Sequence, residues 1–321
     1  MYCIKQYFGL LCLLLFTVNG LPFPNGNKWQ EPTLNNRPII GILAQDTSSA
    51  LGRTYISATY VKFLEQAGAR VVPIRGGQPE EYYIRMVNWT NGALIPGGVV
   101  NFATSLLGRS ARLVYDAALK LNRNQDYFPI WGTCMGFQLL CYLVQGDNLL
   151  KRTDSANISW PLTFTPDFKS SRLFGQAPEN IIQILSTEPV TQNEHHYSIL
   201  TKVFETSKLG KFFKKLSVNR DRKGVEFIST VEGKEFPFYG VQWHPEKPNF
   251  NWNTHYNTDH GPDAVRVSQY MANFFVNEAR KSSHRFPSVK LEATNLIENY
   301  NRTFSSDDTF VDIYYIDPRD T

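Results

Sequence analysis

A short apolar strand runs directly into an apolar helix near the middle of this chain, and glycines punctuate the turn between them. Residues Phe128–Trp131 have the composition of a buried strand, and Met135–Val144 has the apolar density of a core helix. Gly132 and Gly136 flank the turn, where the absence of a Cβ atom permits a tight, strained backbone. This strand–turn–helix favours an α/β fold and presents the residue at its turn for chemistry.

Cys134 lies at this turn, where the helix is predicted to begin. The free N–H groups and the dipole of a helix N-terminus favour the thiolate, which is the reactive form of cysteine. Cys134 is therefore the leading candidate for a catalytic nucleophile. The alternative is that it packs as a small hydrophobic residue, as most free cysteines do.

Cys141 offers an internal comparison, because it follows on the same predicted helix with no glycines around it. We interpret Cys141 as a core residue. Seven helical residues rise about 10.5 Å, which is beyond the reach of a disulfide. Cys134 and Cys141 are therefore both predicted to be free thiols.

A nucleophilic cysteine needs a base, and His244 is the candidate. The segment Phe236–Trp243 has the composition of a strand, and Pro245 ends it immediately after His244. Functional side chains of α/β proteins lie at such strand ends. Glu246 follows two residues later and would orient the imidazole, giving a Cys–His–Glu arrangement. Alone, this tripeptide would indicate only a surface turn.

A third strand end, after Ala93–Ile95, carries the tripeptide Pro96-Gly97-Gly98. Its backbone can approach a bound carbonyl closely, and its N–H groups can stabilise an oxyanion. We expect Gly98, together with the N–H group of Met135, to hold the oxyanion, with Gly97 as a further candidate. The alternative is an ordinary strand-to-helix turn.

Strands and helices alternate after Arg37, which predicts a three-layer α/β/α fold with a largely parallel central sheet. Strands are expected at Pro38–Leu43 and Arg70–Ile74, with a covering helix at Leu106–Leu121. The apolar stripe of another helix is expected to comprise Ile56, Phe63, Leu64 and Ala67. Antiparallel strands are expected at Ile181–Leu185, Phe212–Val218 and Val225–Val231.

The composition predicts one globular domain. The chain has 321 residues, of which 42% are hydrophobic and 19% charged, as in ordinary globular enzymes. We place the core at about residues 37–280 and a polar, peripheral tail at 282–321. The net charge is +4, and the basic cluster Lys208–Lys215 alternates with apolar residues, which indicates a solvated amphipathic face and not a nucleic-acid site.

The N-terminus predicts a secretory signal peptide at residues 1–20. Lys5 precedes the apolar stretch Leu10–Phe16, and Val18 and Gly20 have a spacing suitable for cleavage. The stretch is short for a membrane span, so we expect no membrane anchor. A retained anchor is the less favoured alternative. Cleavage would leave Cys134 and Cys141 as the cysteines of residues 21–321.

Sequons for N-linked glycosylation begin at Asn88, Asn157 and Asn301. Together with the signal peptide they indicate the secretory pathway, with the lysosome or the extracellular space as the destination. The sequence leaves the oligomeric state open, with a homodimer as one alternative.

The motifs at the three strand ends resemble those of the class I glutamine amidotransferase-like group, and longer strings resemble the gamma-glutamyl hydrolase (folylpolyglutamate hydrolase) family. The similarity extends from about Arg37 to Arg280. The strings that carry it are Arg37-Pro-Ile-Ile-Gly-Ile-Leu43, Gln66-Ala-Gly-Ala-Arg-Val-Val-Pro73, Val225-Glu-Phe-Ile-Ser-Thr230 and Gly240-Val-Gln-Trp-His-Pro-Glu-Lys247.

The resemblance implies a cysteine hydrolase that cleaves γ-glutamyl bonds of folate poly-γ-glutamates, with Cys134 as nucleophile and His244 as acid/base. A second histidine of the family corresponds by position to His195, which lies beside His196. Adjacent residues of an extended segment point to opposite faces, so we expect only His195 to face the cleft. This chain has Gln138 where the hydrolases are expected to have glutamate, a departure that bears on substrate tuning.

Arg53, Tyr55 and Tyr60 are the candidates for binding the carboxylates of the substrate. No cofactor is expected, and the histidines lack the spacing of metal ligands. Two other functions stay open. One is a glutamine amidotransferase-type glutaminase, against which the signal peptide and the absence of a synthase domain in this sequence argue. The other is a non-catalytic binder of folate or peptide, although both reacting residues are present.

Overall fold

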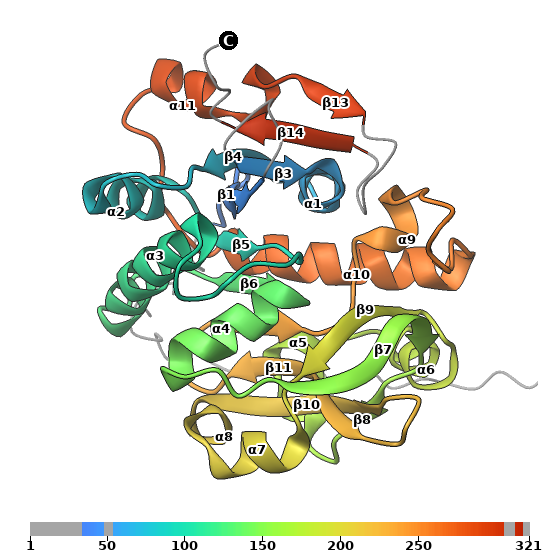
Figure 1. Cartoon of the computed structure of the whole chain (residues 1–321). Coiled ribbons are helices and arrows are strands. Elements are labelled where there is room, and N and C mark those ends of the chain that lie inside the picture. Colours follow the sequence, from blue (N-terminus) through green and yellow to red (C-terminus); the bar gives the residue numbers. More distant parts are fainter. Residues whose placement is uncertain (1–33, 48–53, 305–311, 317–321) are drawn as a thin grey trace, which may run out of the picture. The chain divides into compact units, whose positions relative to one another are not determined.

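The computed structural model describes residues 34–47, 54–304 and 312–316 and builds them around an eight-stranded sheet (Figure 1). Five neighbouring strands are parallel, and three antiparallel strands extend one side. In spatial order the strands are β4 (Arg70–Ile74), β1 (Ile39–Leu43), β5 (Ala93–Ile95), β6 (Ile130–Thr133), β12 (Phe238–Val241), β11 (Glu226–Gly233), β10 (Phe213–Arg220) and β8 (Thr163–Phe164).

Helices cover each face of the sheet. Successive strand residues point to opposite sides, so both faces carry apolar side chains that the helices bury. Ile95 and Ile130 pack into one buried cluster, whereas their neighbours Leu94 and Trp131 pack into another. The first cluster includes helices α2 (Glu80–Trp89), α3 (Leu106–Arg123) and α4 (Met135–Gln145), and the second includes α1 (Ala58–Glu65) and α10 (Pro262–Ala279). The predicted three-layer α/β/α fold with a largely parallel sheet is confirmed.

Two local predictions are wrong. Ile181–Leu185 lies in helix α6 (Glu179–Thr187), where the buried apolar residues form one helical face against the core. Ile56 belongs to strand β3 (Thr54–Ser57) and not to the following helix. Helix α1 begins only at Ala58, because the Ser57 side chain accepts a hydrogen bond from the N–H of Thr59 and caps the helix there.

Two smaller sheets and several short helices complete the described chain. One sheet has the order β13 (Arg302–Phe304), β14 (Asp312–Ile316), β3 and β2 (Gln45–Asp46), and the other pairs β7 (Lys151–Trp160) with β9 (Thr191–Ser198). The short helices are η1 (Phe168–Ser170), α5 (Arg172–Gly175), α7 (Thr201–Thr206), α8 (Lys208–Phe212), α9 (Lys247–Phe250), α11 (Val289–Asn295) and η2 (Ile297–Asn299). The segment expected as a tail thus contributes β14, which pairs with β3.

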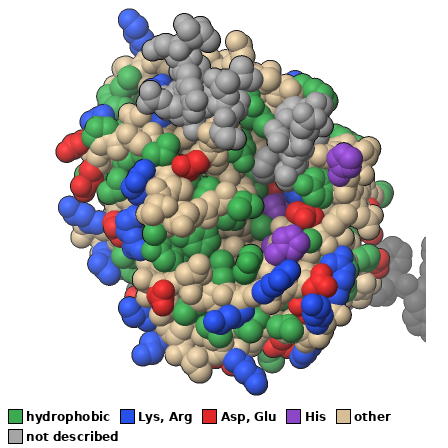
Figure 2. Space-filling view, in the orientation of Figure 1, with side chains coloured by type: hydrophobic (Ala, Val, Ile, Leu, Met, Phe, Trp, Pro, Cys, Tyr) green, Lys and Arg blue, Asp and Glu red, His purple; other side chains and the backbone are tan. Residues whose placement is uncertain are grey.

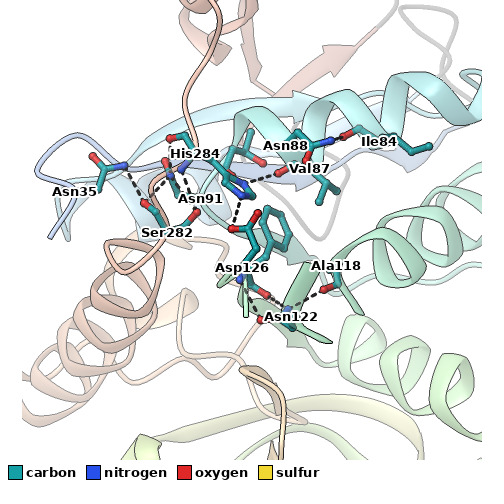
Figure 3. A network of polar contacts seen from close by, with 12 residues as sticks. Asn35, Ile84, Val87, Asn88, Asn91, Ala118, Asn122, Asp126, Ser282 and His284 are labelled. Atoms are coloured by element: carbon teal, nitrogen blue, oxygen red, sulfur yellow. Dashed lines mark hydrogen bonds and ion pairs between the residues drawn. The ribbon is translucent and has the colours of Figure 1, made fainter. Parts of the chain in front are cut away.

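A polar network fixes the chain after α10 to the first half of the sheet (Figure 3). The side-chain oxygen of Asn91 accepts a hydrogen bond of 2.8 Å from the N–H of Ile39. The amide nitrogen of Asn91 donates to the carbonyl groups of Ser282 and His284 at 3.1 and 2.9 Å. The ring of His284 in turn contacts Asp126 at 2.9 Å. These contacts hold the end of α10 against β1.

Candidate active site

Cys134 occupies the turn between β6 and α4 in a strained conformation, with φ 51° and ψ −110°. A non-glycine residue at positive φ is uncommon and is found where the surrounding structure imposes it. A Cβ on Gly136 would overlap the carbonyl of Ile95, and a Cβ on Gly132 would overlap the backbone of Gly136. The two glycines therefore permit the close approach of β5, β6 and α4 that places Cys134 at the turn.

The thiol of Cys134 lies in a buried pocket between three chain segments. Its Sγ is 3.7 Å from the carbonyl oxygen of Glu194 on β9, and its backbone N–H donates to Val241 at the end of β12. A Cβ built on Gly97 would lie 3.3 Å from Cys134 Cβ and 2.8 Å from His244 Cε1. A side chain at position 97 would therefore crowd both the cysteine and the imidazole.

His244 and Glu246 form a buried pair directly after β12. The Nδ1 of His244 lies 2.6 Å from Oε1 of Glu246, and the backbone N–H of His244 donates to the carbonyl of Gln192 on β9. Burial works to lower the pKa of His244, yet the Glu246 carboxylate and the Cys134 thiolate raise it to about 9. The carboxylate therefore both orients the ring and favours its protonated form.

The Pro-Gly-Gly loop after β5 is held from both sides. The N–H of Gly97 donates to the hydroxyl of Tyr60 at 2.8 Å, and its carbonyl accepts from Nε2 of Gln45 at 2.8 Å. The N–H of Gly97 is therefore engaged, which leaves Gly98 and Met135 as the oxyanion candidates. Tyr60 is fully buried and contacts the loop, so its expected role in binding a substrate carboxylate does not fit its position.

A cavity of about 620 Å³ opens beside the thiol, and Figure 2 shows histidine side chains next to an apolar hollow on this face. The cavity is large enough for an extended ligand. The residues of its wall include Cys134, Met135, Gly98, Gln138, His195 and His196.

His195 and His196 both belong to the cavity wall, as do their neighbours Glu194 and Tyr197. That only His195 faces the cleft with its side chain stays a prediction. His195 is buried and held by hydrogen bonds to Asn193 at 3.0 Å and Ser198 at 3.1 Å, whereas His196 is exposed. Burial, together with the nearby charge of His244, lowers the pKa of His195 to about 3. His195 is therefore a neutral imidazole at physiological pH.

Gln138 is tied to two neighbours in the wall of the cavity. Its Nε2 donates to the carbonyl of Tyr197 at 2.7 Å and to Oε1 of Gln242 at 3.1 Å. A glutamate at this position could donate only one of these two hydrogen bonds, and only when it is protonated. The amide of Gln138 thus suits the acceptors that surround it in this chain.

The remaining predicted residues that the structure describes are not part of the cavity wall. Arg53 lies outside the described residues, and Tyr55 is half-buried on β3 and not part of the cavity wall. Asn88, Asn157 and Asn301 are exposed. Over residues 34–47, 54–304 and 312–316, no group of three or more His, Cys, Asp or Glu side chains is placed to bind a metal ion. In the same ranges no helix has the length and apolar character to cross a bilayer.

The sequence did not indicate roles for Gln45 and Lys247, and it suggested a different role for Tyr60. Gln45 and Tyr60 position the Pro-Gly-Gly loop from other elements, and nothing in the local sequence indicates these contacts. Lys247 follows Glu246 directly and is buried. Its place in the string His244–Lys247, next to the predicted site residues, was the signal in the sequence that could have indicated it.

A largely parallel sheet with a cysteine at a strained strand–helix turn, beside a strand-end His–Glu pair, is the arrangement of an α/β cysteine hydrolase. The model of the Peptidase C26 family matches residues 38–246. This chain belongs to that family.

Alignments with relatives and with solved structures cover most of the chain. The gamma-glutamyl hydrolase of Rattus norvegicus is 44% identical over 295 residues, which cover 91% of this chain and 92% of that protein. The gamma-glutamyl hydrolase of Homo sapiens is 42% identical over 319 residues, covering 96% and 98%. Among solved structures, the glutaminase domain of Trypanosoma brucei CTPS has a TM-score of 0.49 and 15% identity, covering 78% of this chain and 96% of that chain.

Proposed function

We propose that this chain is a cysteine hydrolase that cleaves γ-glutamyl bonds, with folate poly-γ-glutamates as its substrates. The observation that carries this proposal is the strained Cys134 at a helix N-terminus, beside the buried His244–Glu246 pair and an open cavity. The names of the two relatives described above support cleavage of this bond.

In the first half of the reaction the thiolate of Cys134 attacks the γ-carbonyl carbon, and a C–S bond forms. The N–H groups of Gly98 and Met135 stabilise the oxyanion, as the backbone of a helix N-terminus can do. The C–N bond then breaks, and His244 gives its proton to the leaving amine. A thioester to Cys134 and a free amine result.

In the second half, water attacks the thioester while the now neutral His244 accepts its proton. The C–S bond breaks, the γ-carboxyl group leaves and gives its remaining proton to solvent, and the thiolate is restored beside a protonated imidazole. Glu246 stabilises this imidazolium through its 2.6 Å contact with Nδ1. His195, which is neutral, can position the substrate but cannot supply a charge.

Turnover by the purified protein separates this function from its alternatives. We expect hydrolysis of a folate poly-γ-glutamate and little release of ammonia from glutamine. A glutaminase of the amidotransferase type would hydrolyse glutamine readily, and a non-catalytic binder would retain the folate ligand without cleaving it. Either result would contradict the proposed function.

We further propose that the protein enters the secretory pathway and reaches the lysosome or the extracellular space. The exposure of Asn88, Asn157 and Asn301 is compatible with glycan attachment. Mature protein from animal cells should begin near Leu21 and lose mass on glycosidase treatment. An unprocessed, unmodified chain would contradict this proposal, and light scattering would decide between a monomer and a homodimer.

A further inference from the structure

The cavity beside the thiol has aromatic and apolar side chains in its wall that the mechanism above does not use. Phe102 and Tyr142 both line it, with ring centroids 5.6 Å apart and ring planes at 48°. Both residues are half-buried, so each keeps a surface that a ligand can reach. Tyr197 and Val99 also belong to the wall and are 53% and 97% exposed. Such a wall suits a ligand with an aromatic part.

The charged side chains of the wall do not suit a long glutamate chain. Asp147 and Glu194 belong to the wall, and within the described part of the chain no lysine or arginine does. The carboxylates of a poly-γ-glutamate would lie beside like charges there, which opposes their binding. An uncharged aromatic group meets no such repulsion.

The position of the cavity relative to the reacting groups indicates which side of the substrate it would hold. The wall includes Cys134 and both expected oxyanion groups, Gly98 and Met135. His244 is not part of it. The acyl carbon bonds to the thiol, whereas the leaving amine must meet His244. The acyl side of the substrate would therefore occupy the cavity, and the leaving glutamate chain would extend from it on the side of His244.

The cavity follows one face of α4 away from the thiol. Met135, Gln138 and Tyr142 all line it, and the seven residues from the first to the last rise about 10.5 Å. The extended chain of one glutamyl residue spans roughly 6 Å between its γ-carbonyl carbon and an aromatic acyl group on its amine. An aromatic group one glutamate away from the thiol therefore reaches the ring of Tyr142. With a second glutamate between them, the aromatic group would begin roughly 12 Å away, beyond that ring.

We propose that Phe102 and Tyr142 bind the aromatic pteroyl group of the substrate, so that this chain cleaves the first γ-glutamyl bond, next to pteroylglutamate. This inference rests on the proposed function and deepens it by naming the bond that is cut. Water adds to the acyl group, and the products are pteroylglutamate and the remaining glutamate chain in one piece. Cleavage further along would bring additional carboxylates to the wall that carries Asp147 and Glu194.

The first products from pteroyl-tri-γ-glutamate distinguish this mode from cleavage at the end of the chain. Liquid chromatography of the initial products should show pteroylglutamate and γ-glutamyl-glutamate appearing together, without pteroyl-di-γ-glutamate. Accumulation of pteroyl-di-γ-glutamate together with free glutamate would overturn the inference.

Ring variants and a second substrate assign the effect to the aromatic wall. N-acetyl-tri-γ-glutamate has the same γ-glutamyl bonds but no aromatic group, so wild type should prefer the pteroyl substrate by roughly 10- to 100-fold in kcat/KM. Tyr142→Leu and Phe102→Leu each remove a ring and should each lower this preference by roughly 3- to 10-fold. Tyr142→Phe keeps the ring and should retain it. So should Trp252→Leu, which removes a 65% exposed ring outside the cavity wall.

Binding to Cys134→Ala protein separates the inference from the reaction, because no turnover is needed. Calorimetric titration should show tighter binding of pteroylglutamate than of N-acetylglutamate, and Tyr142→Leu, added to Cys134→Ala, should reduce that difference. If wild type cleaved neither substrate but this difference held, the proposed function would fail and the aromatic site would stand. Cleavage with no preference for the pteroyl substrate, or with a preference unchanged in Tyr142→Leu and Phe102→Leu, would overturn the role of the rings and leave the proposed function intact.

Discussion

The Nδ1 atom of His244 lies 2.6 Å from Oε1 of Glu246, and both side chains are buried. Because the carboxylate cannot be hydrated there, its interaction with the imidazolium is stronger than on a surface. This one contact links the orientation of the catalytic ring to its protonation.

Replacing Glu246 with glutamine should shift the alkaline limb of the pH–activity profile to lower pH. His244 must be protonated to release the amine, and its pKa of about 9 depends on the carboxylate. Loss of a neighbouring opposite charge typically moves a pKa by about 1 to 3 units. Measurement of kcat/KM between pH 6 and 10 checks this, and an unchanged limb would contradict the role of Glu246.

The same pair predicts how stability depends on pH. The folded-state pKa of about 9 lies above the ordinary value of 6.5, so the pair stabilises the native state fully below pH 6.5. That contribution is lost as the pH rises through 9. The difference in Tm between wild type and Glu246→Gln should therefore shrink between pH 6 and pH 9.5, and a constant difference would count against it.

His195→Ala should lose more activity than His196→Ala, while His244→Ala should lose roughly 10²- to 10⁴-fold, mainly in kcat. His195 is fixed in the cavity wall by Asn193 and Ser198, whereas His196 is exposed. Steady-state kinetics with one γ-glutamyl substrate checks the order. A larger loss in His196→Ala would assign the substrate-positioning role to the neighbouring histidine.

Tyr60→Phe should reduce kcat by roughly 10-fold with little change in KM, because a buried N–H of Gly97 loses its acceptor. The loop that carries Gly98 would then be less well positioned for the oxyanion. Tyr55→Phe is the matched control, since Tyr55 is half-buried and outside the cavity wall. A rise in KM without a change in kcat would instead favour direct contact of Tyr60 with substrate.

Asn91→Ala should lower the free energy of unfolding by about 2 to 3 kcal/mol, since the buried N–H of Ile39 and two carbonyl groups lose their partner. Asn88→Ala, in unglycosylated protein, is the control, because within the described part of the chain its side chain donates to Ile84 of the same helix (Figure 3). It should change stability by less than about 0.5 kcal/mol. Equal urea midpoints for the two variants would contradict the anchoring role of Asn91.

The sequence alone predicted the features that depend on neighbouring residues. The turn at Cys134 and the end of the strand before His244 are set by local glycines and a proline, and the parallel core follows from alternating elements. Ile181–Leu185 was misassigned because a short apolar run fits a strand or a buried helix equally well.

Contacts between distant segments could not be predicted in the same way. The hydrogen bond from Gly97 to Tyr60 joins residues from different elements, and β14 pairs with β3 across almost the whole chain. The sequence string contained Lys247, but only the packing around α9 buries it. Burial and pairing over such separations depend on the assembled fold.

The central claim is that Cys134 is the nucleophile, and the most direct test compares Cys134→Ala with Cys141→Ala in hydrolysis of a folate poly-γ-glutamate. Both cysteines are buried free thiols, but only Cys134 lies in the cavity wall. We predict that Cys134→Ala lowers kcat by more than roughly 10⁴-fold, because the covalent route is lost. Cys141→Ala should keep most of the activity, since deleting a packed thiol affects mainly stability. Equal activity in the two variants would contradict the account.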